Sequence, residues 1–360
     1  MSGSAPSIPN LLSLRGTRGG PRSRGGRGPR RPGLSDDHAI QGTDDDAAVS
    51  RLSAVHLGYL DDPFAQHFVQ ANAYESQRRL PIINRGTYTR TRALDQLIDS
   101  FLSGARPSES DASSQAPERQ IISLGAGTDT RIFRLLSRQS GPALIYHELD
   151  FPESVRKKSS IVRGNSGLQG IIGHPVIEDC GSWSCRPPVG GEYYCHAIDL
   201  RDPLPKDINA SPLKGLKLDV PTLLISECCL CYLEPTLAGV VVDWFAARIP
   251  SLSAILYEPI QPDDSFGRMM ISNLAQRRIR LPTLTTYPTP DHEKRRLLDA
   301  GFAEAGALTV REIWDTWFPP SEKERVDGLE GLDELEEWHM LADHYVVAWG
   351  WRTESARLQA

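Results

Sequence analysis

Two glycines and three acidic residues stand where apolar segments end, and together they suggest a pocket for a nucleoside-bearing cofactor. The apolar run Ile121–Leu124 leads into Gly125-Ala126-Gly127 and then into a helix start. Two later apolar runs also end in acids, since HELD ends at Asp150 and HAIDL contains Asp199. Glycine allows close approach of a ligand to the backbone. A carboxylate accepts two hydrogen bonds from a ribose cis-diol. The pattern predicts a nucleotide pocket at the edge of a sheet.

The glycine spacing favours one cofactor over another. The dinucleotide fingerprint requires a third glycine, and position 130 of this chain is Thr. S-adenosylmethionine has no pyrophosphate that needs that glycine, so we predict this cofactor rather than a nicotinamide nucleotide. Gly125 and Gly127 are expected at its amino-acid end. Asp150 is expected at the ribose, because it follows Gly127 by the spacing typical of a ribose-binding acid.

The remaining polar positions complete the predicted pocket. Asp199 and Leu200 follow a third strand, where the adenine is commonly held. Glu227 ends a fourth strand beside the expected sulfonium and can hold the ammonium group of the cofactor. The alternative for each acid is an exposed strand end with no ligand. Arg51, Arg85 and Arg90 belong to helical segments expected over the mouth of the sheet, where two guanidinium groups can clamp a carboxylate. Solvated surface arginines are the alternative.

Strand and helix patterns alternate from residue 120 onward, which predicts a doubly wound, mostly parallel sheet. Expected strands are 121–124, 143–149, 193–198, 222–226 and 254–258, and expected helices include 152–163, 235–249 and 266–278. Near the end, a helix over 293–300 precedes a last strand over 344–351. A terminal antiparallel hairpin on such a sheet is typical of the class I methyltransferase fold.

The chain divides into five predicted parts. We expect a disordered Arg/Gly-rich tail (1–45), an N-terminal helical lid (46–103), a linker (104–118), a methyltransferase domain (119–352) and a short C-terminal tail (353–360). Residues 164–192, rich in Gly, Pro and Cys, are expected to form a long loop or insertion.

Charge and composition argue against several classes of function. The net charge is −6, and it is −13 without residues 1–33, which hold seven Arg and no acid. An acidic body is a poor match for nucleic acid, although the Arg/Gly tail leaves an RNA contact open. No stretch approaches the ~20 apolar residues of a membrane helix. The six cysteines predict reduced thiols without a metal site, in a cytoplasmic protein that we expect to be a monomer.

Several longer stretches together resemble the leucine carboxyl methyltransferases. They span roughly residues 48–352 in the family's order: SAVHLGYLDDPFAQHFV, INRGTYTRTRALDQLI, QIISLGAGTDTRIFRL, HELDFPESVRKKSSIV, AIDLRD, PTLLISECCLCYLEP, YEP with DDSFGRMMISNL, and LDELEEWHMLADHYVVAWG. The joint occurrence of INRG, LGAGxDT, LDFP and SEC with a following Tyr is more specific than any one motif.

The resemblance implies an enzyme that esterifies the C-terminal leucine carboxylate of the protein phosphatase type 2A catalytic subunit, with S-adenosylmethionine as donor. It implies cofactor roles for Gly125, Asp150, Asp199, Leu200 and Glu227. Arg51 stands where the family more often has Lys, and Arg90 matches the Arg that closes the INRG motif. Tyr232 matches the family's pocket Tyr.

Two alternatives remain open. A small-molecule carboxyl or hydroxyl O-methyltransferase shares the same pocket and differs at the substrate mouth. A non-enzymatic phosphatase-binding protein is the second alternative. A related branch of the family, which modifies a guanosine in phenylalanine transfer RNA, carries a long β-propeller after the methyltransferase domain. This chain ends about eight residues after its last expected strand, so we expect the protein-carboxylate branch.

Overall fold

The computed structural model describes residues 34–69, 78–104, 118–138, 143–205, 213–333 and 335–359. The predicted Arg/Gly tail up to residue 33 and nearly all of the predicted linker lie outside the described residues. Within them, no helix is long and apolar enough to cross a membrane.

One sheet of nine strands organises the described chain, in the order β3-β4-β5-β2-β1-β6-β7-β9-β8. The five strands from β5 to β7 are parallel, and β9 runs antiparallel between β7 and β8. The strand bounds are β1 Arg119–Leu124, β2 Leu144–Asp150, β3 Val176–Ile177, β4 Trp183–Cys185, β5 Glu192–Ala197, β6 Thr222–Glu227, β7 Leu252–Pro259, β8 Glu304–Thr309 and β9 Tyr345–Trp351.

Helices cover both faces of the sheet because neighbouring strand residues point to opposite sides. Ile121 packs in one apolar cluster with residues of α2 and α3, whereas Ile122 packs in a second cluster with residues of α6 and α8. The helix bounds are α1 Leu34–His56, α2 Pro81–Ser103, α3 Arg131–Ser137, α4 Pro152–Arg163, α5 Ser166–Ile172, α6 Pro235–Ala246, α7 Ser265–Gln276, α8 Pro290–Asp299, α9 Val310–Trp317, α10 Pro320–Asp327 and α11 Leu335–Asp343, with short 3-10 turns η1 Ala65–Phe68, η4 Leu230–Tyr232, η5 Pro282–Thr285 and η6 Glu354–Ala356.

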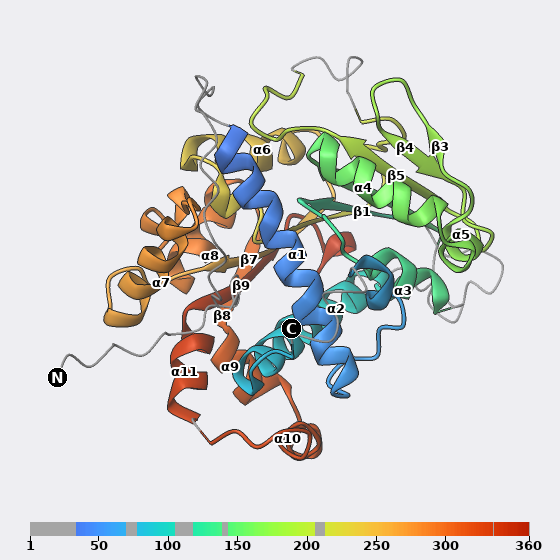
Figure 1. Ribbon diagram of the computed structural model, residues 1–360. Helices are drawn as coiled ribbons and strands as arrows, with labels where there is room; N and C mark the ends of the chain where they lie inside the picture. Colours follow the sequence, from blue (N-terminus) through green and yellow to red (C-terminus); the bar gives the residue numbers. More distant parts are fainter. Residues whose placement is uncertain are drawn as a thin grey trace, which may run out of the picture.

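This topology confirms the predicted class I methyltransferase fold. The strand order reverses between β1 and β6, and a ligand site in such sheets lies at this reversal, outside the carboxyl ends of the strands. Figure 1 shows α1 running diagonally across the middle of the molecule, in front of the sheet. The predicted antiparallel pair at the end of the chain is formed by β8 and β9, although α9, α10 and α11 lie between the two strands.

The first helix begins earlier than the sequence suggests. Residues 34–45, assigned above to the tail, form the first half of α1. This half, LSDDHAIQGTDD, is mostly polar, so it lacks the apolar stripe by which an amphipathic helix is recognised. It is held by side-chain contacts to distant segments: Asp37 pairs with Arg201, and the Asp44 carboxylate accepts hydrogen bonds from Thr128.

Two further segments are more ordered than predicted. Residues 164–192, expected as a loop, contain α5 and the antiparallel strands β3 and β4, which extend the sheet beyond β5. The expected C-terminal tail contains η6, and Leu358 is buried. The apolar residues that dock form only very short runs, such as Leu168 with Ile172 on α5 and Trp183 with Cys185 on β4, so their periodicity is hard to recognise in the sequence.

Candidate active site

An open pocket lies at the carboxyl ends of the central strands. It is bounded on one side by loops that follow β1, β2, β5 and β6, and on the other by α1. With the exception of Arg85, the residues predicted for the site all line it: Arg51, Arg90, Gly125, Gly127, Asp150, Asp199, Leu200, Glu227 and Tyr232. The sheet and its lid therefore bring together residues that are up to 181 positions apart in the sequence.

The glycine loop after β1 turns sharply because both glycines have positive φ. Gly125 has φ 61° and Gly127 has φ 46°, values that other residues adopt at a cost. A Cβ at Gly125 would lie 2.7 Å from the Cys229 sulfur, and one at Gly127 would collide with the Asp44 carboxylate. Only glycine fits at either position, so the backbone itself forms this wall.

Asp150 is fixed at the end of β2 by the glycine loop. Its Oδ2 accepts a hydrogen bond from the Gly127 N–H at 2.6 Å, and its Oδ1 accepts one from the Phe151 N–H at 2.6 Å. Burial raises the pKa of Asp150 to about 6, against the effect of the Gly127 N–H, and the charge of Asp44 adds to this rise. The carboxylate is thus ionised at neutral pH and presents its remaining lone pairs to the pocket.

Asp199 and Leu200 lie at the far end of the pocket, after β5. The Asp199 carboxylate accepts hydrogen bonds from the Arg201 N–H and guanidinium, at 2.6 to 3.1 Å. Arg201 also pairs with Asp37 of α1 and stacks over the Phe151 ring, 5.2 Å from its centroid. A planar arginine over an aromatic ring and the apolar side chain of Leu200 make this end suitable for a flat heterocycle.

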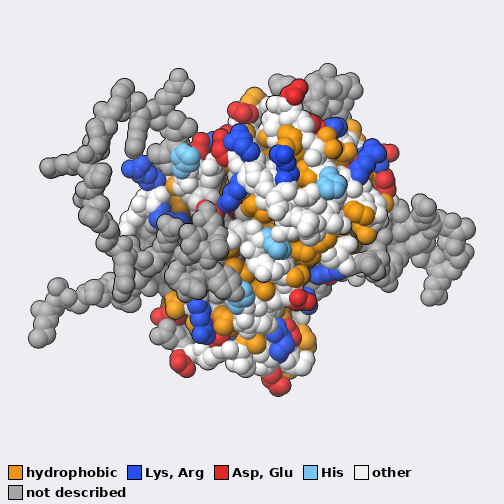
Figure 2. All heavy atoms as spheres, turned by 45° about the vertical axis from the view of Figure 1, so that its right-hand side comes forward, with side chains coloured by type: hydrophobic (Ala, Val, Ile, Leu, Met, Phe, Trp, Pro, Cys, Tyr) orange, Lys and Arg blue, Asp and Glu red, His pale blue; other side chains and the backbone are white. Residues whose placement is uncertain are grey.

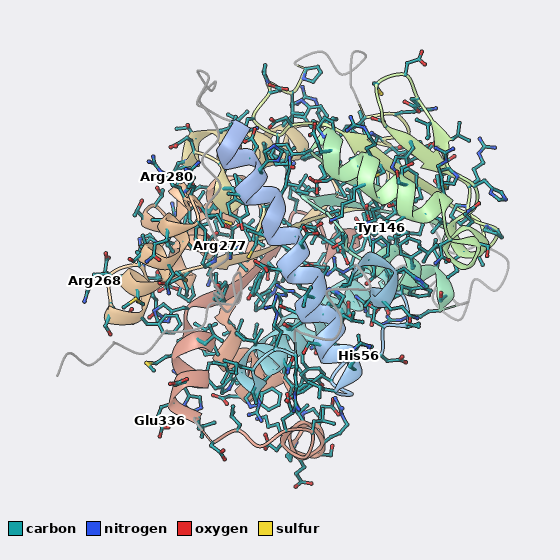
Figure 3. All side chains as sticks on the ribbon, in the orientation of Figure 1. His56, Tyr146, Arg268, Arg277, Arg280 and Glu336 are labelled. Atoms are coloured by element: carbon teal, nitrogen blue, oxygen red, sulfur yellow. The ribbon has the colours of Figure 1, made fainter. Side chains whose placement is uncertain are left out.

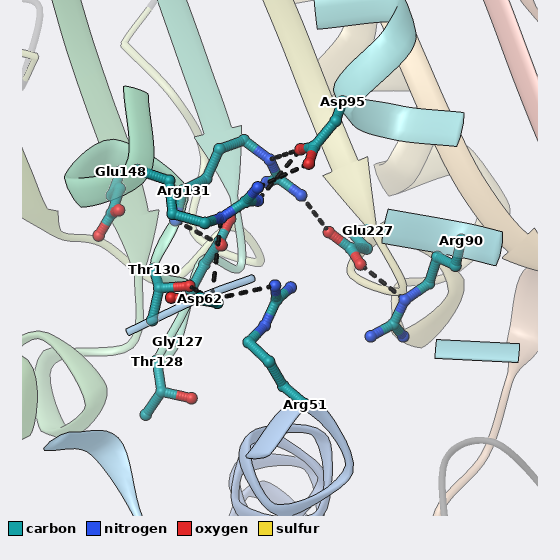
Figure 4. Close-up of polar contacts among 12 residues, drawn as sticks. Arg51, Asp62, Arg90, Asp95, Gly127, Thr128, Thr130, Arg131, Glu148 and Glu227 are labelled. Atoms are coloured by element: carbon teal, nitrogen blue, oxygen red, sulfur yellow. Dashed lines mark hydrogen bonds and ion pairs between the residues drawn. The ribbon is translucent and has the colours of Figure 1, made fainter. Parts of the chain in front are cut away.

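Glu227, at the end of β6, is held between two guanidinium groups. Arg131 donates a hydrogen bond to its Oε2 at 2.9 Å, and the Arg90 Nε lies 2.9 Å from its Oε1 (Figure 4). Burial acts to raise the pKa of Glu227, but Arg90 and Arg131 outweigh it and hold the pKa below its ordinary value. The carboxylate therefore stays ionised beside the glycine loop.

Arg51 approaches the same region from α1. Its Nη1 lies 3.4 Å from Asp62 Oδ2, which is its sole ion pair among the described residues. Arg131 differs, because Asp129, Asp95 and Glu227 all surround its guanidinium. Arg51 and Arg90 thus retain unused donors that face the pocket (Figure 4). Arg85, a third arginine of the lid, does not line the pocket; it pairs with Asp327 and stacks on Trp314.

Tyr232 closes the pocket on the β6 side. Its hydroxyl donates to Thr43 Oγ1 of α1 at 3.5 Å. Burial, together with the nearby Cys231, raises the pKa of Tyr232 well above its ordinary value. The phenol is therefore neutral and acts as a hydrogen-bond donor at physiological pH.

Comparison with known proteins agrees with this geometry. Residues 39–246 match the family model of leucine carboxyl methyltransferases. A protein named leucine carboxyl methyltransferase 1 from Emericella nidulans is 45% identical, over 98% of this chain and 96% of that protein. Its Arabidopsis thaliana homolog is 36% identical, over 86% and 88% of the two chains. The chain belongs to the leucine carboxyl methyltransferase family.

Other similarities are more distant. The human tRNA wybutosine-synthesizing protein 4 is 34% identical over 91% of this chain, which spans 45% of that protein. Among solved structures, a putative methyltransferase from Thermobifida fusca has 14% identity and a TM-score of 0.44, over 89% of this chain and 93% of that one. Membership of the leucine carboxyl methyltransferase family and the fold make this chain an S-adenosylmethionine-dependent carboxyl methyltransferase.

The residues of this family member fit its cofactor. The cradle at Gly125 and Gly127 has no room for a side chain, and Asp150 offers the acceptor that a ribose diol requires. Glu227 supplies negative charge for an ammonium group, and Arg51 and Arg90 supply positive charge for a carboxylate. Among the residues that the structure describes, no group of His, Cys, Asp or Glu could hold a metal ion. All six cysteines are free thiols.

Sequence reasoning missed part of the pocket wall. Five residues of α1 line the pocket at helical spacing: Ile40, Thr43, Asp44, Ala47 and Ala48. In addition, Arg131 fixes the Glu227 carboxylate by a hydrogen bond. Arg131 could have been found, because it ends the LGAGTDTR stretch. No sequence pattern marked the α1 residues, because the polar run around Asp44 has the composition of a disordered tail.

Proposed function

We propose that this chain methylates the α-carboxylate of the C-terminal leucine of the protein phosphatase type 2A catalytic subunit, in the cytoplasm, to form a methyl ester. The observation that carries the proposal is the pair Arg51 and Arg90. Both side chains are almost fully buried, both line the donor pocket, and both have donors not used by the protein. The two guanidinium groups have more donors than the single carboxylate of the cofactor can accept, so they also suit a carboxylate acceptor.

The chemistry needs no general base on the protein. A C-terminal carboxylate has a pKa of ~3.5, so it is already an anion at neutral pH. Bound S-adenosylmethionine supplies an electrophilic methyl group on a sulfonium. The chain must desolvate the acceptor carboxylate, hold one oxygen and leave the other in line with that methyl group.

Arg90 is the residue that we propose for holding the acceptor carboxylate. Its Nε is fixed by Glu227 and its guanidinium stacks over Tyr257, 5.4 Å from the ring centroid, so its orientation is set by two neighbours. Arg51 approaches from the lid and adds a second positive charge. The single proton of the neutral Tyr232 phenol makes only a long contact of 3.5 Å with Thr43, and it can turn from Thr43 to the acceptor carboxylate to orient it.

A small-molecule hydroxyl acceptor would need a base to remove its proton. No histidine is among the described residues that line the pocket. His147 and His196 lie inside the sheet, where their ring nitrogens are 3.0 Å apart. This arrangement supports a carboxylate acceptor, which the names of the relatives also indicate.

The direct test uses the phosphatase catalytic subunit with and without its last residue. Purified enzyme is incubated with radiolabelled S-adenosylmethionine and each form of the subunit. We expect base-labile label on the intact form only. Cofactor binding without label on either form would contradict the proposed substrate and favour a small-molecule acceptor.

A second test separates the acceptor role of Arg90 from cofactor binding. Arg90→Ala should lower turnover far more than it lowers affinity for S-adenosylhomocysteine. Arg163→Ala, an exposed position on α4, is the control and should change neither. An equal loss of turnover and cofactor affinity in Arg90→Ala would contradict the acceptor role.

A further inference from the structure

Three of the six cysteines stand together directly after β6, and the proposed mechanism uses none of them. Residues 227–231 read ECCLC, so Cys228 and Cys231 have the spacing of a C-x-x-C motif. In a chain of alternating strands and helices, this spacing is typical of redox-active thiols.

The backbone folds these two thiols toward each other. In an extended strand, residues three positions apart are separated by about 10 Å, which is beyond the span of a disulfide. Cys228 has φ 50°, in the left-handed region, and the 3-10 turn η4 follows at once, so the chain turns back. Burial raises the pKa of the Cys231 thiol well above its ordinary value, and interaction with the Cys228 thiol adds to the rise. The two thiols therefore lie within reach of one another.

The two thiols have different surroundings. Cys228 is half-buried and lines the pocket, whereas Cys231 is fully buried. Burial acts to lower the pKa of Arg90, but Glu227 and other nearby groups raise it, and one of these groups is the Cys228 thiol. Cys228 thus lies beside the Arg90 guanidinium. A thiol that is open to a pocket and faces a positive charge is the kind that peroxides oxidise.

A buried carboxyl group lies near the second thiol. Glu258, on β7, has no exposed surface. Burial raises the pKa of Glu258 to about 8, against the opposing effects of Arg296 and Cys231. A carboxylate with a pKa near neutrality can take the proton of a neighbouring thiol when that thiol attacks. Cys228 is thus placed as the thiol that meets an oxidant, and Cys231 as the thiol that completes a disulfide.

The pocket, rather than the outer surface, gives access to Cys228. The helix α1 covers the pocket, and Figure 3 shows Arg277 close to this helix, where it pairs with Asp46. On the face drawn in Figure 2, basic and acidic side chains are scattered, so the residues coloured there form no charged patch for a large partner. A small oxidant that diffuses into the pocket is the reagent that these features favour.

We propose that Cys228 and Cys231 are a modification site for hydrogen peroxide, which oxidises them to a disulfide that weakens cofactor binding. The Cys228 thiolate attacks one peroxide oxygen, which forms a sulfenic acid and releases hydroxide. The Cys231 thiol then gives its proton to Glu258 and attacks the Cys228 sulfur, and a second hydroxide leaves. The hydroxides take up the protons of the two thiols, so two thiols and one peroxide give one disulfide and two waters.

The disulfide acts on the pocket because the linked segment carries part of its wall. Glu227 precedes the segment and Tyr232 follows it, and both line the pocket. A covalent bond between two sulfurs is shorter than a contact between two thiols, so the segment contracts toward Cys231. A displaced Glu227 loses its charged hydrogen bond to the ammonium group, and cofactor affinity should fall by about tenfold. Disulfides that form in a reducing cytosol are usually transient, and a thiol reductant should restore the affinity.

The test follows the thiols and the cofactor affinity of the full chain. Reduced enzyme is treated with hydrogen peroxide, the remaining thiols are blocked with an alkylating agent, and the peptides are analysed by mass spectrometry. We expect a disulfide between Cys228 and Cys231, roughly tenfold weaker binding of S-adenosylhomocysteine by calorimetry, and recovery with dithiothreitol. Cys231→Ala should stop at the sulfenic acid, which dimedone labels at Cys228.

A matched control separates this pair from surface oxidation. Cys180 is an exposed thiol outside the pocket, so Cys180→Ser should form the same disulfide and lose the same affinity as the wild type. The proposal would be overturned if peroxide left Cys228 and Cys231 as free thiols, if either paired with another cysteine, or if the linked form kept the affinity of the reduced form. Mapping on the wild-type chain decides these outcomes even if Cys231→Ala folds poorly. Neither measurement uses the phosphatase, so the result is independent of the proposed substrate.

Discussion

The two walls of the pocket are built in different ways. The wall formed by the strand ends relies on backbone geometry and on buried groups, such as the positive-φ glycines and the Asp150 carboxylate that accepts the Gly127 N–H. The wall formed by α1 relies on side chains that reach other elements. Its contacts are Asp37 with Arg201, Asp44 with Thr128, Asp45 with Lys157, and Asp46 with Arg277.

This difference sets an order of sensitivity. The wall at the strand ends depends on backbone conformations that only glycine adopts easily, so a substitution at one of these glycines should abolish the cofactor site. A wall made of several separate side-chain contacts loses one contact at a time, and exposed ion pairs contribute little individually. Substitutions at the strand ends should consequently cost more cofactor affinity than substitutions on α1.

The largest effect is expected for Gly127→Ala, where the two walls touch. The alanine would have to adopt φ near 46° and its Cβ would collide with Asp44. Strain and overlap together should cost about 3 kcal/mol, roughly a hundredfold in affinity for S-adenosylhomocysteine measured by calorimetry. Gly170→Ala, on α5, is the control, since an added Cβ there meets nothing within 4 Å.

The same variant can separate strain from collision. Combining Gly127→Ala with Asp44→Ala removes the overlap and leaves the backbone strain. Because Asp44→Ala also removes the hydrogen bonds to Thr128, the comparison is with Asp44→Ala alone, and Gly127→Ala should cost less affinity in that background than in the wild type. If the cost is the same in both backgrounds, the glycine is required for its conformation alone and not for its contact with α1.

A smaller but pH-dependent loss is expected for Asp150→Asn. Loss of a charged acceptor should cost about 2 kcal/mol of cofactor affinity at pH 7.5. In the wild-type enzyme the raised pKa of Asp150, about 6, means that protonation sets in below that pH. Affinity should hence fall as the pH drops through 6 in the wild type, and this titration should be absent from the variant.

The free energy of unfolding should depend on pH in the opposite direction to cofactor affinity. Because the folded pKa lies above the unfolded value of 3.8, the folded protein binds this proton more tightly, and ionisation of Asp150 costs stability as the pH rises from about 4 to 6. Asparagine has only one acceptor oxygen for the Gly127 and Phe151 N–H groups, so the comparison is made across pH. As the pH rises from about 4 to 6, the Tm of the cofactor-free wild type should fall relative to that of Asp150→Asn, whose amide does not titrate. A constant difference in Tm across this range would contradict the raised pKa.

The strand wall could be predicted from sequence, and its physical basis explains why. Each strand is an apolar run that stops at a glycine or an acid, so Gly125, Gly127, Asp150, Asp199 and Glu227 are marked by the change in pattern. Parallel strands then align these ends at one edge. Strand order itself follows from chain connectivity, which the alternation of strands and helices indicates.

The lid was predicted less completely because its signals are not local. Arg51 and Arg90 were found on helical segments, but the polar half of α1 owes its position to partners such as Arg201 and Lys157, far away in the sequence. The same holds for Arg131, whose role depends on Glu227. Periodicity detects apolar faces, and a helix held by carboxylates has no such face.

Of the two substitutions on α1, Asp44→Ala should lower cofactor affinity more. Its carboxylate accepts two hydrogen bonds from Thr128, from the N–H and from Oγ1, both at 2.7 Å. Their loss should weaken cofactor binding by about 1 kcal/mol, or roughly fivefold. Thr128→Val should cost less, because the N–H contact remains, and the two changes should not be additive. Fully additive losses would show that the contact between Asp44 and Thr128 does not carry the effect.

The smallest effect is expected for Asp45→Ala, one residue further along α1. Its pair with Lys157, at 2.5 Å, joins side chains that are 69% and 40% exposed. Exposed pairs of this kind contribute about 0.5 kcal/mol or less, and salt screens them. The variant should change cofactor affinity by no more than about twofold, and no difference should remain at high salt. If Asp45→Ala matched Asp44→Ala, α1 would behave as one cooperative unit, and the contrast between a rigid strand wall and a lid of separate contacts would not hold.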